Sequence, residues 1–135
     1  MRIVNSRSDF FLSSTSLEWC LVDRASLPDE SALSAVTLAE LAASSHGTSD
    51  KQERARRQDR LQWAAATWDA LPFNTEAARS YGRVFAATRA AGRSSRTGLA
   101  DALIASTAAA NTLPVYTRNP SDFAGLEQIV KVVAI

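Results

Sequence analysis

The sequence predicts a three-layer α/β/α sandwich around a central, mostly parallel sheet, built as a single domain over residues 1–135. Short apolar runs rich in β-branched residues alternate along the chain with longer segments of helical periodicity. This alternation is typical of parallel strands joined by crossover helices that cover both faces of a sheet. Hydrophobic residues make up 46% and charged residues 21% of the chain, a composition that supports a packed core and excludes a disordered chain.

The carboxyl-terminal part shows the clearest succession of elements. Residues 99–110 have helical periodicity, residues 113–117 form a short apolar run with the length of a strand, and residues 129–135 suit a last strand. Asp101 then lies in the first turn of a helix, whereas Thr117, Asn119 and Asp122 follow the carboxyl end of a strand. Ligands collect at that end of the strands in open α/β sheets.

The middle of the chain supplies one more strand and three more helices. The pattern predicts a strand over 32–36 and helices over 37–45, 50–70 and about 75–91. Thr37 and Glu40 have the spacing of a capping box at the start of the first of these helices. Asn74 is a candidate cap for the third helix, and Gly92 is a candidate stop.

The amino-terminal segment has a weaker pattern. Residues 2–4 read as the first strand, followed by Asn5, and residues 9–17 read as a helix that begins with Asp9. A turn is predicted over 27–30.

The net charge excludes neither nucleic-acid nor protein partners, whereas the cysteine content and the hydropathy pattern are more restrictive. The net charge is +1, and the single cysteine, Cys20, cannot form an internal disulfide. No apolar run reaches the length of a membrane span and no signal peptide is evident, so we expect a cytoplasmic protein without membrane contact.

Two stretches resemble a known family. The run DALIASTA at 101–108 followed by LPVYTRNPSDF at 113–123 is similar to the carboxyl-terminal half of PIN-domain ribonucleases, in particular the VapC-type toxins of toxin–antitoxin pairs. The run TLAEL at 37–41 resembles the motif around the second acid of that family. The resemblance covers about residues 31–135 and is poor before them.

This resemblance implies a PIN-like fold and a metal-dependent endoribonuclease toxin. Water would attack a phosphodiester of structured RNA, with tRNA or rRNA as the expected substrate. A small antitoxin protein would bind the domain and can place an arginine in the acid pocket.

Three carboxylates are candidate ligands for Mg²⁺ or Mn²⁺, which prefer oxygen ligands. Taken singly, Glu40 suits a helix cap, Asp101 suits the helix dipole, and Asp122 suits a loop. Together, and in the order found in the family, they indicate a metal site with catalytic function. Thr117 and Asn119 are candidate secondary groups near the metal or its water, or else ordinary turn residues.

The family's first strand usually ends in an aspartate, and here that position is ambiguous. Asn5 follows the predicted first strand but carries no charge, whereas Asp9 is the nearest acid. Either Asp9 takes the first-ligand position, or the site has lost one carboxylate. In the second case, the alternative is a weakened or silent PIN-fold binding partner.

The remaining polar and apolar clusters have simpler interpretations. The arginines on the helix over 50–70 are expected to form a solvated face, although they could receive phosphates. The apolar faces of the helices over 50–70 and 75–91 hold more large residues than one small sheet needs, which predicts a homodimer.

Overall fold

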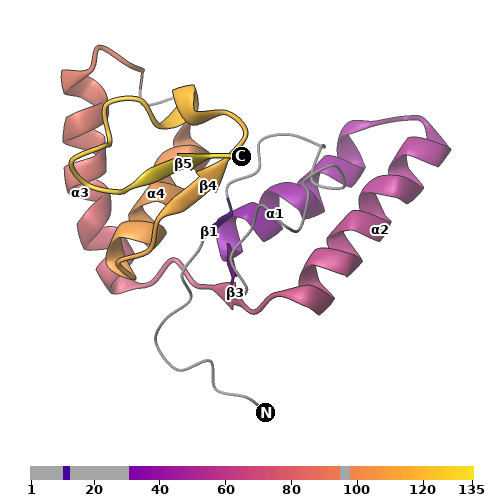
Figure 1. Ribbon diagram of the computed structural model, residues 1–135. Helices are drawn as coiled ribbons and strands as arrows, with labels where there is room; N and C mark the ends of the chain where they lie inside the picture. Colours follow the sequence, from indigo (N-terminus) through magenta and orange to yellow (C-terminus); the bar gives the residue numbers. More distant parts are fainter. Residues whose placement is uncertain (1–10, 13–30, 95–97) are drawn as a thin grey trace.

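The computed structural model describes residues 11–12, 31–94 and 98–135 (Figure 1). Its strands are β1 (Phe11–Leu12), β2 (Ala32–Ser34), β3 (Ala70–Leu71), β4 (Val115–Thr117) and β5 (Val132–Ala134). Its α-helices are α1 (Ala35–Ser44), α2 (Lys51–Thr67), α3 (Thr75–Ala90) and α4 (Leu99–Ala110). Two short 3-10 helices are η3 (Ser45–Gly47) and η4 (Pro120–Phe123).

The five strands form one sheet in the order β3-β2-β1-β4-β5. Every pairing between the described strands is parallel, and Leu12 of β1 lies opposite Leu33 of β2 and Tyr116 of β4. The direction in which strands are added reverses between β1 and β4, and ligands in open α/β sheets bind outside the carboxyl ends of the strands at such a switch point. The predicted fold class, α/β with a parallel sheet, is confirmed.

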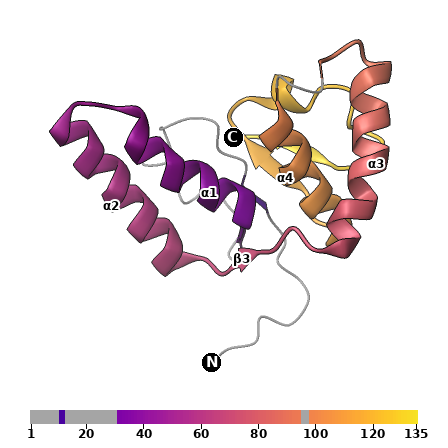
Figure 2. The same ribbon diagram turned by 180° about the vertical axis from the view of Figure 1, so that it is seen from behind.

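The helices pack in pairs beside this sheet. Figure 2 shows α1 and α4 in front of the strands, with α2 next to α1 and α3 next to α4, and the same pairs are in contact. In the part of the chain that the structure describes, no helix is long and apolar enough to span a membrane.

The prediction for the amino-terminal segment is wrong at Phe11–Leu12. The pattern assigned these residues to a helix over 9–17, but they form strand β1. Pairing on both sides, with β2 and β4, decides the conformation of these two residues, and local pattern does not reveal such pairing. The strand predicted over 2–4, the rest of that helix and the turn over 27–30 lie outside the described residues.

The capping box predicted for Thr37 and Glu40 is also wrong. Helix α1 begins at Ala35, and its cap is Ser34, whose Oγ accepts a hydrogen bond from the Val36 N–H at 3.0 Å. The predicted strand over 32–36 therefore ends two residues earlier. Glu40 falls in the second turn of α1, so capping does not account for it.

Other boundaries also differ from the prediction, whereas those of α3 agree with it. Helix α2 ends at Thr67, and the two-residue strand β3 follows it where the sequence predicted only a helix end. The last strand is limited to Val132–Ala134. The caps predicted for α3 are confirmed, because Asn74 Oδ1 accepts from the Ala77 N–H and the helix ends just before Gly92.

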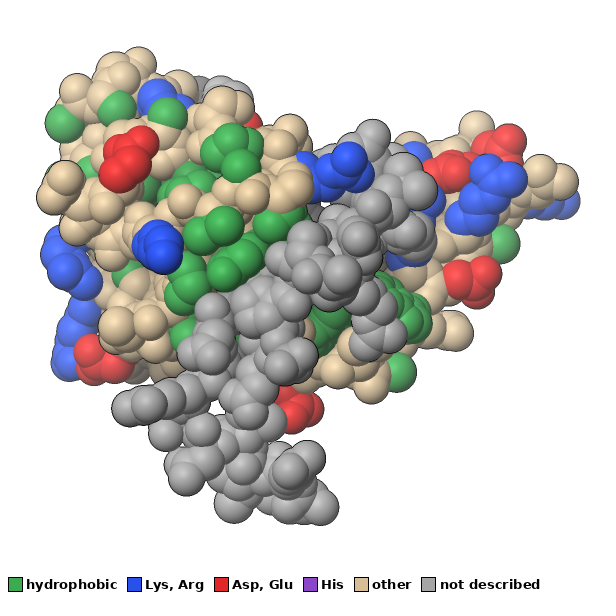
Figure 3. Space-filling model, viewed as in Figure 1, with side chains coloured by type: hydrophobic (Ala, Val, Ile, Leu, Met, Phe, Trp, Pro, Cys, Tyr) green, Lys and Arg blue, Asp and Glu red, His purple; other side chains and the backbone are tan. Residues whose placement is uncertain are grey.

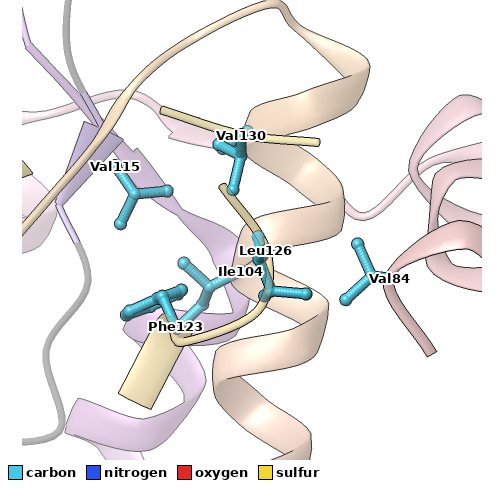
Figure 4. Packing of buried hydrophobic residues seen from close by; sticks show 8 residues of the cluster. Val84, Ile104, Val115, Phe123, Leu126 and Val130 are labelled. Carbon is cyan, nitrogen blue, oxygen red and sulfur yellow. The ribbon is translucent and has the colours of Figure 1, made fainter. Parts of the chain in front are cut away.

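The main core surrounds α4. Ile104, Ala105 and Ala108 of this helix are fully buried, as is Val84 of α3 (Figure 4). The same cluster includes residues from β4 and from the segment after it, namely Val115, Phe123, Leu126 and Val130. A helix enclosed in this way has little freedom to move. Helix α4 is therefore a rigid base for the side chain of Asp101 in its first turn.

Candidate active site

Three of the predicted site residues are acids. Two of them lie on helices that follow parallel strands, and the third lies in the first turn of a helix. Glu40 belongs to α1, which follows β2, and Asp122 belongs to η4, which follows β4. Asp101 belongs to the first turn of α4. The three carboxyl groups interact in two pairs, Glu40 with Asp101 and Asp101 with Asp122.

Glu40 is partly buried and interacts with Asp101. Burial, and after it the negative charge of Asp101, raises the pKa of the Glu40 carboxyl from 4.5 to about 7. Its Oε2 atom is buried without a hydrogen-bond partner. A carboxylate in such surroundings is costly in its charged form unless a cation compensates it.

Asp101 interacts electrostatically with both other acids and is only 6% exposed. Burial is the main cause that raises the pKa of this carboxyl to about 6, and the negative charge of Asp122 adds to it. The positive charge of Arg93 acts in the opposite direction. An acid that merely complemented the helix dipole would be stabilised in its charged form, so the raised pKa argues against that interpretation.

The two oxygens of Asp101 have different surroundings. Oδ1 is buried without a hydrogen-bond partner. Oδ2 is 3.5 Å from the place that a Cβ atom on Gly98 would occupy, and Nη2 of Arg93 is 4.0 Å from the same place. These are ordinary contact distances, so the requirement for glycine at position 98 comes from its left-handed backbone, with φ 87°.

The donor chemistry of these acids fits a hard divalent cation. Glu40 and Asp101 each direct an unpaired oxygen into a buried environment, and both bind protons unusually tightly in the absence of a cation. Within residues 11–12, 31–94 and 98–135, no three acidic, histidine or cysteine side chains are close enough to enclose a metal ion together. A closed group is not required for Mg²⁺, which binds through one or two carboxylates and keeps several waters.

Thr117 and Asn119 form the turn at the end of β4. Thr117 is 3% exposed, and its Oγ1 accepts a hydrogen bond from the Asn119 N–H at 3.0 Å. Asn119 is exposed and directly precedes η4. The bond holds the strand end against the loop that carries Asp122, which agrees with the turn interpretation of these two residues.

Asn5 and Asp9 lie outside the described residues. Both precede β1 in the sequence, whereas ligands at this edge of a parallel sheet follow the strands. The sequence after Leu12 runs through Ser13 and three further hydroxyl residues, and the first acid in it is Glu18.

Sequence reasoning missed Arg93 and Gly98, which it placed in or next to a polar loop. The helix stop at Gly92 indicates only that a loop follows it. No local pattern shows that Arg93 approaches Asp101 and the main chain at Asp122.

The arginines of α2 interact with neighbouring acids and main-chain carbonyls. Arg57 forms a 2.8 Å ion pair with Glu53 and donates to the Ser44 carbonyl, and Arg54 donates to the Thr48 carbonyl. Figure 3 shows basic and acidic side chains mixed over the part of the molecule that contains α2. The exposed arginines of α2 therefore form a solvated face with internal ion pairs, whereas Arg57 and Arg60 are partly buried and Nη1 of Arg60 is buried without a hydrogen-bond partner.

The chain is similar to known proteins over most of its length. The PIN domain family model matches residues 13–126. Ribonuclease VapC5 of Mycobacterium tuberculosis is 35% identical over 114 residues, which cover 84% of this chain and 82% of that protein.

Solved structures show the same likeness. The structure of VapBC-5 from Mycobacterium tuberculosis, described as a member of the VapBC family of toxin–antitoxin systems, matches with a TM-score of 0.78 and 33% identity. The match covers 94% of this chain and 98% of that chain. FitAcB from Neisseria gonorrhoeae shares the fold with a TM-score of 0.72 at 24% identity, covering 91% and 95% of the two chains. The chain therefore belongs to the PIN-domain family, as a homologue of VapC-type ribonuclease toxins.

Proposed function

We propose that this protein is a metal-dependent endoribonuclease toxin that cleaves structured RNA by attack of water on a phosphodiester. The observation that carries the proposal is the buried pair Glu40 and Asp101, each with an oxygen lacking a partner, beside the charge of Asp122. The relationship to a protein named as a ribonuclease supports the reaction class and does not favour a silent binding partner.

Glu40 and Asp101 would contact Mg²⁺ or Mn²⁺ directly, and Asp122 would act on the ion through its retained waters. When bound, such an ion supplies positive charge that favours ionisation of the water nucleophile and neutralises the leaving oxygen. Burial of Asp101 fixes its carboxylate in one place. Helix α1, which follows β2, supplies Glu40. Thr117 and Asn119 shape the rim of the site through the turn that joins β4 to η4.

The partners in this proposal are an RNA and a small antitoxin protein. The similar structure of VapBC-5 is described as a member of a family of toxin–antitoxin systems, which supports an antitoxin for this chain as well. An antitoxin that delivers a cation to Asp101 would compensate the buried charge as a metal does. The tRNA or rRNA substrate class and the homodimer stay predictions. Exposed Trp63 and Phe73 are compatible with a subunit contact.

We expect Asp101→Asn to reduce RNA cleavage in Mn²⁺ by more than about 100-fold, because outer-shell changes alone cost roughly 10–100-fold and this change removes a ligand charge. The amide keeps the shape of the side chain. Cleavage of a labelled structured RNA by purified protein measures the effect. The control is Asp69→Asn, because Asp69 is an exposed acid before β3. Equal cleavage by all three proteins would contradict the proposed site.

The same assay tests the amino-terminal candidates. Because Asn5 and Asp9 precede β1, we expect Asn5→Asp and Asp9→Ala to cleave RNA at the wild-type rate. A large gain with Asn5→Asp would instead assign the first-ligand position to Asn5. Loss of cleavage with Asp9→Ala would assign that position to Asp9.

The raised pKa values predict how stability depends on pH without metal. The folded protein binds protons at Glu40 and Asp101 that the unfolded chain has already lost, so their stabilising contribution is complete below about pH 4. It is lost as the pH rises through about 6 and 7. We expect Glu40→Gln to flatten this decline by an amount on the order of 1 kcal/mol, which is less than the full pKa shift would give because solvent screens a carboxyl group that is only partly buried.

Urea unfolding in a chelator between pH 4.5 and pH 8, at intervals of about half a unit, measures this slope. Asp69→Asn is again the control and should keep the wild-type slope. Identical slopes for wild type and Glu40→Gln would show that Glu40 is not a buried member of an acid cluster.

A further inference from the structure

The end of α3 is built to hold Arg93 in one place. Gly92 has a left-handed backbone with φ 73°, and its N–H donates to the Arg89 carbonyl at 3.0 Å. The Arg93 N–H donates back to the Thr88 carbonyl at 3.1 Å. These two bonds form a Schellman motif, which fixes the backbone at Arg93 relative to α3.

From this fixed point the guanidinium reaches the loop that carries Asp122. Nη1 of Arg93 donates to the main-chain oxygens of Asp122 and Ala124, the second at 3.4 Å. The acceptors are backbone carbonyls on either side of Phe123, whose side chain is 1% exposed in the core. The guanidinium therefore fastens the main chain at the acid while the next side chain anchors the loop in the core.

A close packing contact between the main chain of Gly125 and the side chain of Ala91 also holds this loop against the end of α3. Gly125 has φ 88°, and a Cβ atom there would lie 2.7 Å from the Cβ atom of Ala91 at the end of α3. Such an approach leaves room only for glycine. Figure 1 shows the segment after η4 passing beside the end of α3, and Leu126 then enters the core.

We propose that Arg93 is a positioning residue for the active site, which holds Asp122 beside Asp101 by fastening the main chain of the η4 loop to the end of α3. The inference rests on the proposed function, because the purpose of that position is to bind a divalent ion. Both bonds come from Nη1, and arginine suits the task better than lysine because the planar guanidinium holds the N–H donors of this atom in a fixed direction, whereas an ammonium group rotates.

The experiment compares Arg93→Ala and Arg93→Lys with Arg89→Ala. Arg89 is an exposed arginine in the last turn of the same helix, so its removal costs the same charge at nearly the same place. The readouts are Mn²⁺ binding by titration calorimetry and hydrogen exchange of the loop amides. Two of these amides have local partners, Asp122 N–H with the Asn119 carbonyl and Ala124 N–H with the Ser121 carbonyl.

We expect Arg93→Ala to weaken Mn²⁺ binding by roughly 10-fold or more, the range found when a group that orients a ligand is removed. Exchange should become faster across residues 120–126 and stay unchanged in α4. Arg93→Lys should keep the charge but lose part of the protection, and Arg89→Ala should match wild type in both readouts.

Several outcomes would overturn the proposal. Wild-type affinity and exchange in Arg93→Ala would do so, and so would an equal loss of affinity in Arg89→Ala, which would show a general effect of charge. If Arg93→Ala does not fold, Arg93→Lys decides, because wild-type exchange in it contradicts the proposal and faster loop exchange supports it. If wild type binds no Mn²⁺, the proposed function fails, and the exchange comparison still decides whether Arg93 positions the loop.

Discussion

Burial of the Asp101 carboxylate next to two other acids is the interaction on which the rest of the site depends. Carboxylates that lie close together repel one another, and burial adds the cost of removing them from water. The packing of α4 outweighs this cost locally, because Ile104, Ala105 and Ala108 bury that helix in the core. The fold thus holds negative charge in an arrangement that is unfavourable by itself and favourable once a cation is present.

The surrounding architecture explains how acids distant in sequence meet. In the order β3-β2-β1-β4-β5, the connections that leave β2 and β4 start at the same edge of the sheet. One delivers Glu40 on α1 and the other delivers Asp122 on η4. Ser34 at the end of β2 caps α1 directly, so no loop separates the strand from the helix that carries Glu40. Helix α3 supplies none of these three acids. The segment at its end supports the η4 loop through Arg93 and through the close approach of Ala91 to Gly125.

The sequence predicted the parts of this account that depend on local pattern. Helix α4 and strand β4 have clear periodicity and length, and the same pattern places Asp101 and Asp122 at the junctions of these elements. Strands β1 and β3 have only two residues each, too few for any periodicity, and their pairing is set by neighbours in the sheet.

Other features depend on contacts that a linear pattern does not contain. The cap of α1 is Ser34 instead of Thr37, since the strand before the helix ends earlier than its apolar run suggested. The sequence places Arg93 in a polar loop. Its role is not visible there, because its acceptors are main-chain atoms in a distant part of the chain. A side chain that binds backbone leaves no partner residue type to search for in the sequence.

The most direct measurement of the central claim is an anomalous difference map from crystals of the protein grown with Mn²⁺ and recorded at the manganese absorption edge. Burial of paired carboxylates with unpaired oxygens predicts a peak within bonding distance of both Glu40 and Asp101. In crystals of Asp101→Asn grown in the same way, the peak should be absent. A manganese peak away from both carboxylates, or an unchanged peak in Asp101→Asn, would contradict the claim that these acids form the metal site.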